Sequence, residues 1–209
     1  MLNTDSPKRF WLALGPALSI PAVAAFVYFL TDIPPAAAQS FYAGAKIFLV
    51  VWPVIAWLKI LPKQQRALPK NPNRAKSAVW GLISGALIVG AIVVVMQTPI
   101  ADQVNAIKPL IEEKGEQLGF LNYFIPFALI MSLIHSALEE YYWRGFVAGR
   151  LATAMKPVVA HLIAAAGFAA HHYIVVYVYF PESPILFLFF GTCVGIGGFI
   201  WSEIYQRTG

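Results

Sequence analysis

The chain has 209 residues, of which 59% are hydrophobic and only 12% charged, which excludes an ordinary soluble globule. This composition predicts an all-α integral membrane protein. The formal net charge of +5 does not indicate a nucleic-acid partner, because the basic residues are scattered at the ends of apolar segments rather than gathered on one surface. We therefore expect the lipid bilayer, and no nucleic acid, as the surroundings of this chain.

Apolar segments recur along the chain at close to the ~20 residues that a helix needs to cross the hydrocarbon core. They are Phe10–Leu30, Phe41–Leu61, Ala78–Gln97, Leu121–Leu138 continuing toward Phe146, Val158–Phe180 and Ile185–Ile204. The first could be read as a secretory signal, but it is longer than the roughly 7–15 residues of a signal core, so we expect a retained span. The sequence thus predicts a polytopic bundle of about six transmembrane helices.

The stretch 98–119 separates the third predicted span from the fourth and is polar. Its apolar residues recur at three- and four-residue steps, a pattern typical of an amphipathic helix that lies in the membrane interface. We therefore predict an interfacial helix here. The same stretch suggests a division into N-terminal transmembrane helices with this outer segment, residues 1–119, and a helical core, residues 120–209.

The distribution of basic residues predicts the orientation. With a cytoplasmic N-terminus and six crossings, only Lys46, Lys108 and Lys114 of the 15 lysines and arginines fall on the outer side. An excess of inner positive charge is what the positive-inside rule requires. We expect the N-terminus inside and, from the shortness of the chain, a bacterial cytoplasmic membrane.

Two adjacent acids, Glu139 and Glu140, interrupt the fourth apolar segment. A carboxylate at membrane depth costs about 2.5–3.5 kcal/mol or more, so each needs a cation, a proton or a function. Glu140 and Arg144 are four residues apart in the order that favours an ion pair on a helix. Arg144 can pair with only one acid, and Glu139 instead shares its helix face with His135 and Trp143.

The next span supplies histidines at 171 and 172. With a helical rise of about 1.5 Å per residue, His172 lies ~22 Å from the start of its span and Glu139 lies ~16 Å from Arg150, so the two can meet at one depth. Burial makes a carboxylate a stronger base toward water, and an imidazole can stabilise the developing oxyanion. The pair therefore indicates hydrolysis. We expect His171 to face another side of the helix. His135, which could orient Glu139, and His171 are kept as possible site residues.

Glu139-Glu140-x-x-x-Arg144 followed by Phe168-x-x-x-His172 resembles the two leading motifs of the type II CAAX-prenyl endopeptidase and bacteriocin-processing family of glutamic intramembrane proteases. The resemblance covers residues 121–209. It implies a multi-span helical fold in which Glu139 and His172 are catalytic, while Glu140, Arg144 and Phe168 support the site. It also implies hydrolysis of a membrane-associated peptide or protein, in maturation or C-terminal tail processing, by a glutamate-activated water without a cofactor.

A third motif of that family, His-x-x-x-Asn or Asp, has no counterpart, since no histidine, asparagine or aspartate follows His172. We expect the core to lack its last helix. The alternatives are that another group supports the oxyanion, or that the chain is not a competent protease.

Other functions stay open from sequence. Glu139 and Glu140 could be solvated at the inner interface beside Arg144, where aromatic residues form a belt. A metal-dependent membrane protease could use His135, Glu139 and His172 as ligands, although the His-Glu-x-x-His signature is absent and we predict no metal. A non-catalytic immunity or scaffold protein would keep the helices without the activity, and a proton-coupled carrier would use the same polar groups as a relay.

Overall fold

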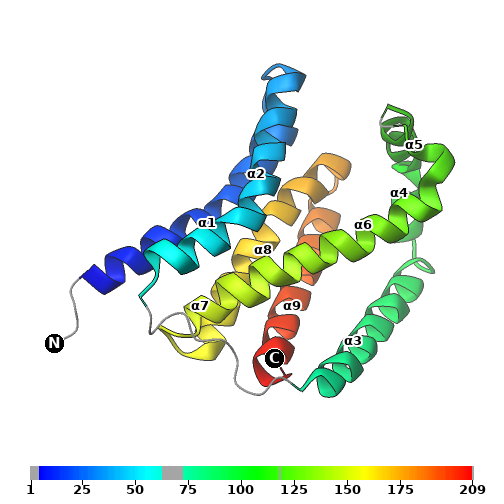
Figure 1. Cartoon of the computed structure of the whole chain (residues 1–209). Helices are drawn as coiled ribbons and strands as arrows, with labels where there is room; N and C mark the ends of the chain where they lie inside the picture. Colours follow the sequence, from blue (N-terminus) through cyan, green and yellow to red (C-terminus); the bar gives the residue numbers. More distant parts are fainter. Residues whose placement is uncertain (1–4, 63–72, 118, 209) are drawn as a thin grey trace. The chain divides into compact units, whose positions relative to one another are not determined.

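The computed structural model describes residues 5–62, 73–117 and 119–208, and every regular element in these ranges is helical (Figure 1). The elements in chain order are α1 (Asp5–Leu30), α2 (Pro35–Ile55), η1 (Ala56–Ile60), α3 (Arg74–Val95), α4 (Ile100–Ala106), α5 (Lys108–Gln117), η3 (Leu121–Tyr123), α6 (Phe124–Glu139), η4 (Glu140–Ala148), α7 (Gly149–Leu151), α8 (Pro157–Tyr179) and α9 (Pro184–Thr208). The predicted all-α class is confirmed.

Within the described residues, six helical segments are long and apolar enough to cross a membrane. They are Pro7–Leu30, Pro35–Ile60, Arg74–Val95, Leu121–Leu151, Pro157–Tyr179 and Pro184–Thr208. Each overlaps one predicted span, and the fourth is the longest because η4 and α7 continue α6 without a break. The chain is an integral, multi-pass membrane protein.

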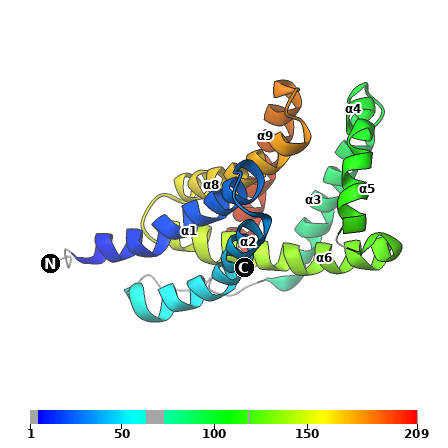
Figure 2. The same cartoon turned by 90° about the horizontal axis from the view of Figure 1, so that it is seen from above.

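The described helices fall into two compact units, and the first contains residues 5–62 and 138–207. In this unit α1 packs against both α2 and α8, and η4 packs against α8 (Figures 1 and 2). Small side chains fill much of the core and allow close helix contacts, as is common in membranes. The buried core residues are Phe10, Ala13, Leu14, Ala17, Ala56, Leu61, Tyr142, Trp143, Phe146, Val147, Ala148, Leu151, Ala160, Ala164 and Phe168.

One hydrogen bond across this core repairs a defect in α1. Pro21 lies inside α1 and has no N–H, so the carbonyl of Ala17, four residues earlier, lacks its usual helical donor. The Tyr142 hydroxyl donates to that carbonyl at 2.8 Å, in a buried contact. An unsatisfied carbonyl is costly inside a membrane protein, and this bond therefore ties α1 to η4.

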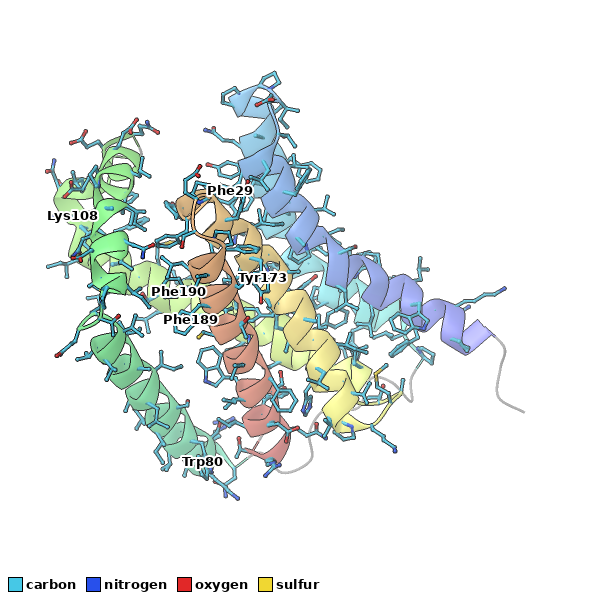
Figure 3. All side chains as sticks on the ribbon, turned by 180° about the vertical axis from the view of Figure 1, so that it is seen from behind. Phe29, Trp80, Lys108, Tyr173, Phe189 and Phe190 are labelled. Carbon is cyan, nitrogen blue, oxygen red and sulfur yellow. The ribbon has the colours of Figure 1, made fainter. Side chains whose placement is uncertain are left out.

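The second unit contains residues 73–117 and 119–137. Figure 3 labels Trp80 on α3 and Lys108 on α5, two of its helices. Within the predicted segment 98–119, α4 and α5 are helical, so the described part forms two helices rather than one. Pro109 accounts for the break, because its missing N–H and fixed φ suit the first turn of α5 but not a helix interior. An interfacial position for these two helices stays a prediction.

The compact units do not follow the division at residue 119 predicted from the sequence. They are defined by packing, and the first unit draws on both predicted parts. The predicted division follows the polar stretch 98–119 along the chain, which packing does not test. It stays a prediction.

We expect Tyr142→Phe to lower the free energy of unfolding in detergent by about 1–2 kcal/mol, because the Ala17 carbonyl loses its donor. The measurement is thermal or denaturant unfolding of the purified protein. Tyr141→Phe is the matched control: its hydroxyl donates to the Val50 carbonyl at 3.1 Å in an exposed contact, and α2 runs on through Val54, whose N–H can serve that carbonyl. Equal losses in both variants would contradict the repair role.

Candidate active site

The first motif lies where the helix changes its geometry. Glu139 is the last residue of α6, and Glu140 begins η4, a π-helix that runs to Ala148. A π-helix closes its hydrogen bonds over five residues rather than four, and such segments are frequent at functional sites. The structure corrects the expectation of a regular α-helix toward Phe146, because the wider turn redirects every side chain after Glu139.

Arg144 is buried at the centre of the site. Its side chain is 1% exposed, and Nη1 lies 3.2 Å from Oε1 of Glu140, which is half exposed, so the predicted ion pair is present. The guanidinium Cζ stands 4.5 Å from the centre of the Phe168 ring and 5.3 Å from that of Trp201. Both are cation–π distances. Arg144 is enclosed by protein, which argues against the alternative that this motif is merely solvated at the interface.

Glu139 lies among the histidines of α8. One ligand atom from each of Glu139, His171 and His172 falls within 4.8 Å of the others, and all three side chains are half-buried. The structure thus brings Glu139 and His172 together, as the sequence predicted. A carboxylate and two imidazoles around one small space can hold and deprotonate a water molecule.

A backbone hydrogen bond fixes the His172 ring. Its Nδ1 lies 2.8 Å from the carbonyl oxygen of Phe168, and because a carbonyl can only accept, Nδ1 carries the proton. The ring therefore acts on its surroundings through Nε2. Phe168 contributes in two ways, since its ring covers Arg144 and its carbonyl orients His172.

The expectation that His171 faces away from this space is wrong. Its Nε2 lies 3.7 Å from Oε1 of Glu139. Adjacent helical positions differ by about 100° in direction, but the two histidine rings have centres only 4.1 Å apart, so one carboxylate can face both. The ring of Trp143 stacks on His171 and holds it in place. The two ring centres are 5.8 Å apart and the ring planes differ by 6°.

Gly167 makes room for that stack. A Cβ added at Gly167 would meet the Trp143 ring at 3.0 Å and Leu18 at 3.0 Å. Since Gly167 is one helical turn before His171, Trp143 lies flat over both positions. Gly167 therefore leaves space for the Trp143 ring, and that ring positions His171.

The position of His135 relative to the other candidates stays a prediction. His135 is half-buried on α6 and belongs to the second unit, whereas Glu139, His171 and His172 belong to the first. In the group of described residues that could hold a metal, His171 accompanies Glu139 and His172. The ligand set with His135 that the sequence suggested stays untested.

Two interactions were not foreseen from the sequence. Trp201 covers Arg144, and no pattern in α9 distinguished it from an ordinary apolar residue. Nδ1 of His161 lies 2.6 Å from Oε1 of Glu203, which also pairs with Arg207 at 3.0 Å. The sequence carried a signal for this second interaction, because ionisable residues in neighbouring apolar segments are expected to pair with one another.

Comparison with known families agrees with the motifs. Residues 121–209 match the family model described as type II CAAX prenyl endopeptidase Rce1-like. This part of the chain is similar to that family. The matched region contains all five motif residues described above. No curated protein and no solved structure matches the chain.

We expect Gly167→Ala to destabilise the protein by about 1–3 kcal/mol, because the new methyl group displaces Trp143. The measurement is the unfolding midpoint in detergent. Gly44→Ala is the control: a Cβ at Gly44 meets nothing within 4 Å, so this helical position should gain about 0.5–1 kcal/mol. A stabilising Gly167→Ala would contradict the close packing of Trp143 on α8.

Proposed function

We propose that the chain is an intramembrane endopeptidase in which Glu139 activates a water molecule to hydrolyse a membrane-associated peptide or protein. The observation that carries this proposal is the placement of Glu139 against His171 and His172 within a region similar to the Rce1-like family. The role would be maturation or removal of a C-terminal tail. The mechanism uses no cofactor.

In the proposed reaction, Glu139 accepts a proton from water while the water oxygen bonds to the carbonyl carbon of the scissile peptide. The carbonyl oxygen becomes an oxyanion. His172, with its Nδ1 proton engaged by Phe168, acts as an imidazolium whose Nε2–H donates a hydrogen bond to this oxyanion and keeps its proton throughout. The intermediate then expels the amine, which takes the proton from Glu139 and regenerates the carboxylate.

Glu140, Arg144 and Phe168 act as positioning residues in this mechanism. Glu140 neutralises Arg144, which allows the guanidinium to stay buried beneath Phe168. Phe168 is then held in place, and its carbonyl orients His172. Because Glu140 is paired with Arg144, its carboxylate does not compete for the reacting water, and Glu139 acts as the base.

The decisive experiment replaces Glu139 with Gln and His172 with Ala, and compares new protein termini in the membrane fraction of cells that express each variant. Both variants should lose the cleavage products made by the wild-type protein, by about 10²–10⁴-fold, because each removes a proton-transfer or charge-stabilising group. In ¹⁸O-labelled water, the new carboxylate of each wild-type product should carry the label.

Glu182→Gln is the matched control, since it makes the same chemical change in the exposed turn between α8 and α9 and should leave cleavage unchanged. Expression and unfolding midpoints must be equal among the variants. A biological phenotype that survives both Glu139→Gln and His172→Ala would contradict the protease proposal and favour the immunity or scaffold alternative.

We further propose that the protein resides in a bacterial cytoplasmic membrane with its N-terminus inside, because twelve of the 15 basic residues would then be on or near the inner side. An alkaline phosphatase fused after Gln117 should be active, since this position follows three crossings. A fluorescent protein fused after residue 209 should fluoresce in the cytoplasm. Inactive phosphatase at Gln117 would contradict this orientation.

A further inference from the structure

The cluster of Glu139, His171 and His172 has the composition of a transition-metal site. One carboxylate and two imidazoles form a ligand set that zinc uses with a fourth position left for water. Imidazole nitrogen also favours zinc, copper, iron or nickel over the oxygen-seeking calcium and magnesium. The three ligand atoms lie within 4.8 Å of one another.

The spacing is close to that of a bound ion. Ligands about 2.0–2.2 Å from a tetrahedral zinc ion stand roughly 3.3 Å apart. Oε1 of Glu139 and Nε2 of His171 are 3.7 Å apart. The remaining ligand-atom separations are at most 4.8 Å.

Neighbouring groups orient both rings for coordination. Metal-binding histidines usually donate their second N–H to a carbonyl or carboxylate, and His172 does so to the Phe168 carbonyl, which leaves Nε2 as the nitrogen available for coordination. His171 is held by the Trp143 stack. Its Nδ1 is buried without a hydrogen-bond partner among the described residues, so its polar interactions are concentrated on Nε2, which faces Glu139.

We propose that Glu139, His171 and His172 bind one divalent transition-metal ion, of which zinc is the natural candidate, and that this ion inhibits the protein. The inhibitory role rests on the proposed function, because coordination occupies the carboxylate and the imidazole that would activate water. Zinc proteases with the His-Glu-x-x-His motif use a glutamate that is not a ligand as the base beside the bound water. The adjacent carboxylate, Glu140, is already paired with Arg144 at 3.2 Å.

The test of the site uses Co²⁺ alone as a probe, added to the purified full chain in detergent, with the visible absorption of the bound ion as the readout. The wild-type protein should bind one ion. Glu139→Gln, His171→Ala and His172→Ala should each weaken binding beyond the about 10–100-fold that is typical of losing an outer-shell group. His135→Ala and Cys193→Ser should retain the wild-type spectrum.

Each outcome has one meaning for the site. Loss of binding in His171→Ala with retention in His135→Ala supports the structural ligand set. An unchanged spectrum in His171→Ala, or loss in Cys193→Ser, overturns it. Absence of a Co²⁺ spectrum in the wild-type protein, which must first show a cooperative unfolding transition, also overturns it, while the proposed protease activity is unaffected.

The inhibitory role is tested separately by cleavage. A chelator should leave wild-type cleavage unchanged or raise it, and added Zn²⁺ should abolish it reversibly. Loss of cleavage on chelation, restored by Zn²⁺, would overturn inhibition because the ion would then be catalytic. If Glu139→Gln cleaves normally yet has lost Co²⁺ binding, the proposed function fails while the metal site stands.

Discussion

The burial of one arginine charge governs the arrangement of the first unit. Arg144 is 1% exposed, and none of its guanidinium nitrogens makes a hydrogen bond to a described residue, so its stabilisation depends on Glu140 and on the rings of Phe168 and Trp201. These partners come from η4, α8 and α9. The charge is accommodated only when the three helices are packed together. Since Glu139 precedes Glu140 and His172 follows Phe168 by one turn, the same packing brings Glu139 to His172.

Sequence reasoning was most successful where the physics is local. The six spans follow from runs of apolar residues, and each lies within a few residues of its helix. The ion pair of Glu140 and Arg144 follows from their four-residue spacing. The meeting of Glu139 with His172 required only a constant helical rise and two antiparallel neighbours, which is a geometric argument with little freedom.

The remaining features depend on packing that no local pattern encodes. The π-helix that begins at Glu140 breaks the regular periodicity on which facing arguments rest. His171 was assigned to the wrong side because the direction of a residue on a helix does not account for the size of its ring. Trp143 can stack on His171 because residue 167 is glycine. Predictions from local sequence patterns commonly fail at candidate functional positions of this kind.

The proline in α1 has a consequence for biogenesis. The carbonyl of Ala17 enters the bilayer during synthesis, yet the hydroxyl that satisfies it belongs to Tyr142, which is 125 positions later. Until that tyrosine arrives, the first hairpin carries an exposed polar defect in the lipid, so it cannot reach its final stability alone. Completion of the N-terminal helices therefore waits for the insertion of η4, which links their assembly to the segment that begins at Glu140.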